Sequence, residues 1–211
     1  MNTRMITVNP LNPEAGPIDE AVYVLKRGGV IGYPTETVYG LAVDAYNEDA
    51  LRKLFMIKER EMNKPISLLV RDVAMVEAVA SRIPPVALSL IRGYWPGALT
   101  IIFAASERCS PILTGQSGKI GVRISPHRIV QTLLDAFKNP ITATSANLSG
   151  MPSVVDSHEV YRVFRGKIDL VIDGGKAPGE GESTVIDVTV SPPKVLREGV
   201  VKFGGVDRGG G

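Results

Sequence analysis

The chain has 211 residues, of which 44% are hydrophobic and 22% are charged, and its formal net charge is +2. This composition is ordinary for a globular domain and excludes a polycation, so any nucleic-acid surface would have to be a local patch of Lys and Arg. Cys109 is the only cysteine, which excludes an intrachain disulfide. Residues 1–17 contain no apolar run typical of a signal peptide, and no segment reaches the roughly 20 apolar residues of a membrane helix. We therefore expect a cytoplasmic protein.

Strand and helix signals alternate along the first half of the chain. Asn47 and Asp72 are helix-capping residue types that directly precede amphipathic runs, and Pro17 suits a first helical turn. The expected helices span 17–27, 48–60, 73–80 and 86–94, and the expected strands span 5–8, 30–33, 41–44, 67–70 and 99–104.

The second half continues the alternation and then ends in strands alone. Its expected helices are 128–137 and 157–165, and its expected strands are 120–124, 141–144, 170–173, 184–188 and 194–196. The pattern predicts a single α/β domain over 1–203, in which a twisted mixed parallel and antiparallel sheet is flanked by helices and holds a concave ligand cleft. We expect a mobile loop at 176–182 that could lie over the site, and a disordered Gly-rich tail at 204–211.

Common catalytic templates are absent from the sequence. There is no P-loop, HExxH, GxSxG or CxxC pattern. His127 and His158 lie far apart with no cysteine nearby, so no metal site is predicted. Cys109 lacks an obvious base partner, and we interpret it as structural.

Two hydroxyl-rich segments follow predicted strands. Residues 34–41 read PTETVYGL, and residues 145–150 read SANLSG. Ligands bind α/β sheets where strands end, so both segments are candidate binding loops. A simple turn between strands explains the first segment equally well, and an Asx or Ser turn is the alternative for the second.

Three cations qualify as anion ligands. Lys58 and Arg60 are two residues apart and can face one ligand only if the helix ends there, as the loop at 62–65 suggests; the alternative is an ordinary cationic helix end. Arg123 sits in an apolar strand, where an unpaired charge is costly. It therefore either points to solvent or binds an anion, and we favour the anion.

The combined motifs resemble the YrdC/Sua5 family over roughly residues 17–201. The matching segments are 28–41, 58–60, 94–100, 122–125, 145–150, 173–175, 182–187 and 196–199. The resemblance implies a YrdC-like domain and the nucleotidyltransferase activity of an L-threonylcarbamoyladenylate synthase, which uses L-threonine, bicarbonate and ATP and releases pyrophosphate. The adenylate would pass to a threonylcarbamoyl transferase complex that modifies adenosine 37 of tRNA.

The same resemblance assigns site residues. L-threonine is expected at Thr35, Arg123 and Ser183. ATP is expected at Lys58, Arg60, Lys64, Ser145, Asn147, Ser153 and Arg197, with Lys58 and Arg60 as catalytic residues. Mg²⁺ is expected to arrive with ATP, without a tightly bound metal on the protein.

Two positions depart from the family pattern. Lys64 and Leu69 stand where members often have asparagine and histidine, and 67–72 leans towards the YciO branch. The intact Ser-Ala-Asn segment favours an active synthase. Because the chain ends soon after Arg197, we expect the short YrdC-type form without the additional Sua5 domain. The alternatives are a non-catalytic module that binds double-stranded RNA or tRNA, and a YciO-like nucleotide-binding paralogue.

Overall fold

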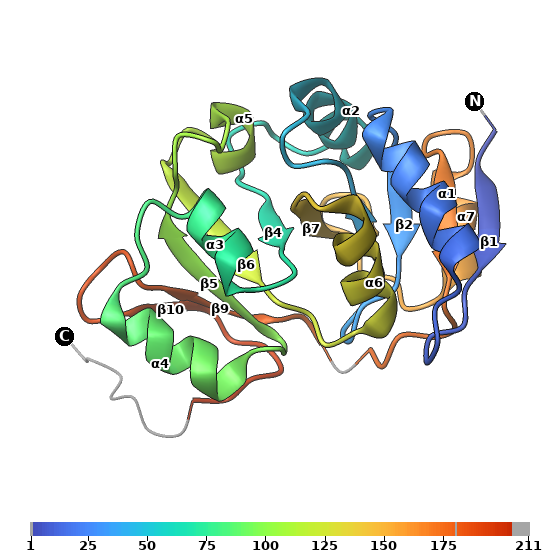
Figure 1. Ribbon diagram of the computed structural model, residues 1–211. Coiled ribbons are helices and arrows are strands. Elements are labelled where there is room, and N and C mark those ends of the chain that lie inside the picture. The colour runs from blue at the N-terminus through green and yellow to red at the C-terminus, as the bar shows by residue number, and fades with distance from the viewer. Residues whose placement is uncertain (1, 180, 204–211) are drawn as a thin grey trace.

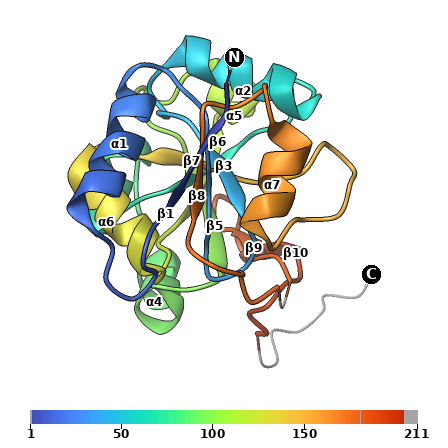
Figure 2. The same ribbon diagram turned by 90° about the vertical axis from the view of Figure 1, so that its right-hand side faces the viewer.

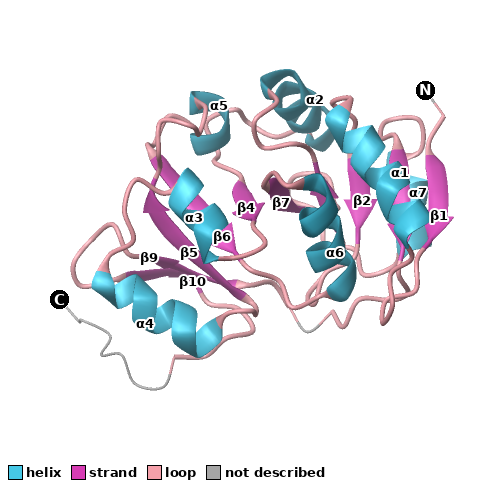
Figure 3. Ribbon diagram, in the orientation of Figure 1, coloured by secondary structure: helices cyan, strands magenta, loops and turns pink. Residues whose placement is uncertain are grey.

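One mixed sheet organises the protein (Figures 1 and 3). The computed structural model describes residues 2–179 and 181–203, so the predicted tail at 204–211 lies outside the described residues. The 10-stranded sheet has the order β1-β8-β2-β3-β7-β4-β6-β5-β9-β10. Its strands are β1 (Arg4–Thr7), β2 (Ile31–Tyr33), β3 (Gly40–Ala42), β4 (Ser67–Leu69), β5 (Leu99–Ala104), β6 (Lys119–Arg123), β7 (Ile141–Ser145), β8 (Leu170–Asp173), β9 (Thr184–Asp187) and β10 (Lys194–Arg197).

The helices begin and end close to their predicted positions. They are α1 (Ala15–Lys26), α2 (Glu48–Lys58), α3 (Val73–Val79), α4 (Pro85–Tyr94), α5 (Pro111–Thr114), α6 (Arg128–Phe137) and α7 (Ser157–Phe164). The predicted caps are confirmed: the side chain of Asn47 accepts from the Ala50 amide, and that of Asp72 accepts from the Met75 amide. Only α5 was not predicted.

The sheet is mixed, as expected. β1 and β2 both pair with β8 in parallel, and β4 with β6 and β5 with β9 are also parallel. The remaining pairs are antiparallel, including β3 with β7 and β7 with β4, which join the two halves of the sheet. The first and last strands, β1 and β10, therefore lie at the two edges of the sheet, and β7 lies between β3 and β4 at its centre.

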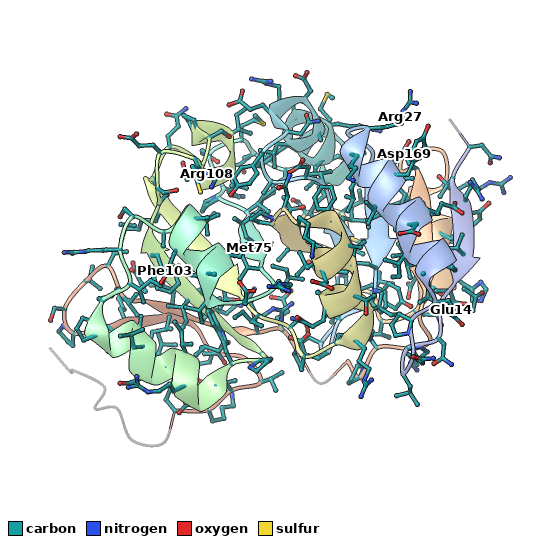
Figure 4. All side chains as sticks on the ribbon, viewed as in Figure 1. Glu14, Arg27, Met75, Phe103, Arg108 and Asp169 are labelled. Carbon is teal, nitrogen blue, oxygen red and sulfur yellow. The ribbon has the colours of Figure 1, made fainter. Side chains whose placement is uncertain are left out.

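Helices cover both faces of the sheet. Helices α1 and α6 pack together over one face and bury Leu25 and Leu133 against β2 and β8, whereas α7 lies on the opposite side (Figure 2). A second, larger core includes Phe103, and the partly buried Met75 packs against it (Figure 4). Among residues 2–179 and 181–203, no helix has the length and apolar character needed to span a bilayer.

Candidate active site

A cavity of about 260 Å³ opens over the middle strands of the sheet. Strands β2 to β7, β9 and β10 and the turns beside them supply its walls, which join segments that lie far apart in the sequence (Figure 1). The lining residues are Tyr33, Thr35, Thr37, Val38, Tyr39, Gly40, Arg60, Pro65, Ile66, Ser67, Thr100, Arg123, Ala143, Thr144, Ser145, Glu182, Ser183, Val185 and Arg197.

The turn between β2 and β3 is held by one buried hydroxyl. Thr35 Oγ1 donates to the carbonyl of Val38 at 2.7 Å and accepts from the amides of Thr37 and Val38. The Thr35 and Thr37 hydroxyls also lie 3.0 Å apart. The turn interpretation of this segment is confirmed, and the hydroxyls that shape the turn also line the cavity, as the binding-site interpretation requires.

Arg123 points into the cavity from β6 rather than to solvent. Its Nη1 lies 3.1 Å from Glu36 Oε1 and donates to the Thr37 hydroxyl at 3.4 Å. Glu36 Oε2 accepts from the hydroxyl of Ser125. A buried cation requires a partner, and Glu36 is that partner.

Lys58 lies beneath the loop that follows β7. The helix α2 ends at Lys58, and Glu59 is left-handed at φ 52°, so the condition under which Lys58 and Arg60 can face one ligand is met. The Lys58 ammonium, 2% exposed, donates to the carbonyls of Ser145 and Asn147 at 2.5 and 2.7 Å. The pKa of Lys58 is lowered to about 8, through burial first and the charge of Arg60 second, while the charge of Glu182 acts in the opposite direction.

The loop itself is closed by Asn147. Its side-chain oxygen accepts from the Ser145 hydroxyl at 2.6 Å, and its amide nitrogen donates to the carbonyl of Met151. Ser145 lines the cavity, whereas Asn147 does not. Lys58 and Asn147 therefore hold the loop from the side away from the cavity, and Ser145 faces the cavity.

Arg60 leaves the helix end and lines the cavity. Its guanidinium donates to the carbonyls of Lys64 and Pro65 at 3.3 and 2.9 Å, which fixes the segment leading into β4. Burial lowers its pKa below the usual range. The Lys64 ammonium instead lies 2.9 Å from Glu61 on an exposed side of that segment.

The opposite wall is built by β5, β9 and β10. The hydroxyls of Ser183 and Thr100 lie 2.8 Å apart, and Arg197 donates to the carbonyl of Ser183 through Nε and Nη2. Arg197 Nη1 binds the carboxylate of Glu182, whose other oxygen accepts from Ser153 at 3.0 Å. The expected loop at 176–182 includes residue 180, which lies outside the described residues.

The tyrosines of the cavity remain neutral hydroxyls. Burial raises the pKa of Tyr39 to about 12, and its hydroxyl donates to the carbonyl of Gly175 at 2.6 Å. Burial also raises the pKa of Tyr33 strongly. The polar groups of the walls are therefore mainly neutral hydroxyls and cations.

The cavity unites predicted residues of both substrates. Thr35, Arg60, Arg123, Ser145, Ser183 and Arg197 line it, whereas Lys58, Lys64, Asn147 and Ser153 do not. Leu69 packs in the core. Sequence reasoning assigned no role to the polar residues Glu36, Ser67, Thr100 and Glu182. The alternation along β4 and β5 could have indicated Ser67 and Thr100, since it directs every second side chain to one face.

The described residues form no cluster of three or more His, Cys, Asp or Glu side chains that could hold a metal. Among the lining residues, Glu182 carries the one carboxylate, and it is engaged by Arg197 and Ser153. The walls are therefore suited to an anionic ligand.

Two named proteins are similar to this chain in sequence. A threonylcarbamoyl-AMP synthase of Pyrococcus abyssi is 39% identical over 175 residues, which cover 83% of this chain and 52% of that protein. A threonylcarbamoyl-AMP synthase of Coxiella burnetii is 36% identical over 170 residues, covering 81% of this chain and 91% of that protein. The chain thus spans about half the length of the first relative and nearly all of the second.

Solved structures agree with the sequence comparison. A crystal structure of P. abyssi Sua5 complexed with L-threonine superposes with a TM-score of 0.89 at 37% identity, covering 92% of this chain and 57% of that one. The crystal structure of E. coli YciO superposes with a TM-score of 0.88 at 30% identity, covering 95% and 97%. The family model Sua5_yciO_yrdC, described as "Telomere recombination", matches residues 23–199. The chain belongs to the Sua5/YciO/YrdC family.

Proposed function

We propose that this protein is a threonylcarbamoyl-AMP synthase that makes L-threonylcarbamoyladenylate and pyrophosphate from L-threonine, bicarbonate and ATP. One observation carries the proposal: a single cavity joins the predicted threonine residues Thr35, Arg123 and Ser183 to the predicted ATP residues Arg60, Ser145 and Arg197. The names of the two relatives and the L-threonine bound to P. abyssi Sua5 support it.

The chemistry proposed for the cavity has two steps. The threonine amine attacks bicarbonate and water leaves, which gives a carbamate. A carbamate oxygen then attacks the α-phosphorus of ATP, and the bond from this phosphorus to the bridging oxygen breaks, so that pyrophosphate leaves with that electron pair. Neither step requires an oxidant or a reductant. The adenylyl transfer makes the protein a nucleotidyltransferase.

The walls match these requirements by position and charge. Arg123 suits the threonine carboxylate, since a guanidinium can bind a carboxylate with two parallel hydrogen bonds. Arg60 and Arg197 suit the phosphates, where negative charge develops as pyrophosphate leaves. Alignment of the two reactants supplies much of the rate in such a site, which accounts for a cavity rich in hydroxyls and cations.

ATP is proposed to enter as its Mg²⁺ complex, so the ion belongs to the substrate. Mg²⁺ favours oxygen ligands and keeps several waters, which suits phosphate oxygens better than the cationic walls described above. Lys58 is proposed to act on the phosphates through the loop that it holds and through its charge, and Lys64, Asn147 and Ser153 to complete the nucleotide side.

The unstable adenylate requires a consumer. We propose that it passes to a threonylcarbamoyl transferase complex acting on tRNA in the cytoplasm. The names of the relatives state that they make threonylcarbamoyl-AMP, the adenylate that such a complex would consume.

The test is release of pyrophosphate from ATP in Mg²⁺ buffer, measured with and without L-threonine and with and without bicarbonate. Release that requires both, together with a labile adenylate detected by mass spectrometry, supports the synthase. No release from folded protein that still binds ATP refutes the synthase and favours a YciO-like nucleotide-binding role. RNA binding that weakens steeply with salt, without ATP cleavage, would favour the RNA-binding module instead.

A further inference from the structure

A carboxylate of the protein lies among the groups predicted to bind ATP. Glu182 lines the cavity, and one of its oxygens binds Nη1 of Arg197 while the other accepts from the Ser153 hydroxyl at 3.0 Å. Its charge also acts on the neighbouring Lys58 ammonium. One anion of the chain therefore engages two residues predicted to bind ATP and influences a third.

This arrangement is weak enough to be displaced. The side chains of Arg197 and Glu182 are 46% and 40% exposed, and half-exposed ion pairs stabilise proteins only slightly because water competes for both partners. The remaining donors of Arg197, Nε and Nη2, are engaged by the Ser183 carbonyl, which keeps the guanidinium in place. An incoming phosphate can thus replace the carboxylate on Nη1 without moving the arginine.

We propose that Glu182 is an internal competitor for the phosphate groups of the ligand, a built-in anion that occupies the phosphate ligands Arg197 and Ser153 between turnovers. This inference rests on the proposed function for the identity of the ligand.

The competition has a consequence for product release. Pyrophosphate carries several negative charges and would be held firmly by free cations in a partly enclosed site. When Glu182 returns to Arg197, it replaces part of the charge that pyrophosphate had satisfied, so the product leaves more easily. Tighter binding of phosphates in the ground state would not accelerate the reaction, since only interactions stronger in the transition state do so.

The test is calorimetric binding of inorganic pyrophosphate and of ATP, in buffer with EDTA, to the wild type and to Glu182→Gln. The variant should bind both ligands tighter by on the order of threefold to tenfold, because the competing charge is gone. Glu182→Ala should change affinity in the same direction, and it also removes a side chain able to accept from Arg197. Thermal melts establish that each variant is folded.

Glu159→Gln is the matched control. It removes the same charge from the exposed pair with Arg162 on α7, outside the cavity lining, and should leave both affinities unchanged. Unchanged or weaker binding of pyrophosphate to both Glu182 variants would overturn the inference, and weaker binding would make Glu182 a ligand rather than a competitor. Because pyrophosphate binding needs no catalysis, failure of the synthase assay with tighter pyrophosphate binding would refute the proposed function alone.

Discussion

The guanidinium of Arg123, on β6, lies 3.1 Å from the carboxylate of Glu36, in the turn between β2 and β3. Both side chains are largely buried, at 8% and 16% exposure. Glu36 also accepts from the Ser125 hydroxyl, so the carboxylate is fixed from two sides. The pair connects two segments that are distant in sequence. It places the guanidinium of Arg123, with its charge neutralised by Glu36, at the wall of the cavity.

Replacing Glu36 by glutamine should leave a buried guanidinium without a counter-charge. We expect the free energy of unfolding to fall by about 2–4 kcal/mol, since breaking one side of a buried ion pair costs more than the pair contributes. Because Glu36 fixes the position of the Arg123 guanidinium, whereas Arg197 is held by the Ser183 carbonyl, its loss should misplace that guanidinium and raise the KM for L-threonine, while ATP affinity changes little. Urea unfolding and titration with each substrate measure the two effects.

A double variant separates charge from shape. Glu36→Gln combined with Arg123→Met removes both charges, and it should recover part of the lost stability while threonine binding stays impaired. Stability losses that simply add in the double variant would show that the two side chains do not act as a pair.

Thr35→Val should weaken threonine binding by about tenfold or more and retain ATP binding. The substitution removes the hydroxyl that donates to the Val38 carbonyl and accepts from two amides, so the turn also loses about 1–3 kcal/mol. Thr35→Ser keeps the hydroxyl and is the control. Calorimetry showing lost ATP binding with intact threonine binding would place the two substrates at opposite ends of the cavity from those proposed.

Arg60→Ala should lower kcat/KM by about 10²–10³, comparable to the loss of one preorganised donor to a developing anion. The control is Arg52→Ala, also in the α2 region, where the guanidinium pairs with Glu48 and Asp49 at the surface. That variant should retain full activity. Near-normal turnover of Arg60→Ala would remove this residue from the proposed mechanism.

Local sequence signals predicted most of the fold. Helix α6 (Arg128–Phe137) and strand β5 (Leu99–Ala104) match their expected bounds because apolar residues repeat at the helical period in the first and form a mostly apolar run in the second. Helix α5 was missed because four residues are too few to show a period, although Ser110 caps it and Pro111 begins it.

The site was predictable only in part, because its remaining polar contacts are long-range. Glu182 could not be placed among cations from sequence, since its position depends on the pairing of β9 with β5 and β10. The role of Lys58 depends on carbonyls about 90 residues further along the chain, at Ser145 and Asn147. No local pattern encodes such a contact. The hydroxyl-rich turns at Thr35 and Ser145, in contrast, are recognisable from the residues of the turns themselves.

Gly121→Ala probes the floor of the cavity. A Cβ at Gly121 would lie 2.6 Å from Ser67 Oγ and 3.2 Å from Thr100 Cγ2, and both of these residues line the cavity. We expect Ser67 to be displaced, the KM for L-threonine to rise, and stability to fall by about 1–3 kcal/mol. Gly93→Ala in α4 has no neighbour within 4 Å and should be neutral or slightly stabilising. A normal KM in Gly121→Ala would show that Ser67 does not shape the substrate volume.

Because of Lys58, the stability of the fold should rise with pH while the affinity for ATP falls. Its pKa is about 8 in the folded protein, through burial first and the charge of Arg60 second, against about 10.4 in an unfolded chain. Between these values the unfolded chain holds the proton that the folded protein has lost, so the unfolded state binds more protons and stability rises with pH. Over the same window the ammonium charge near the phosphates disappears, so ATP affinity should fall.

Lys58→Met isolates this titration, because methionine has a similar shape and no proton to lose. Between pH 8 and pH 10.4, the unfolding free energy of the wild type should rise relative to the variant by about 1–3 kcal/mol. ATP affinity of the wild type should decline over that range, while the variant binds ATP weakly at every pH, because the Ser145 and Asn147 carbonyls have lost their donor. Urea unfolding and ATP titration at pH 7, 8, 9 and 10 measure both trends. Parallel stability curves for the two proteins would mean that Lys58 keeps its proton over this pH range and that burial does not lower its pKa.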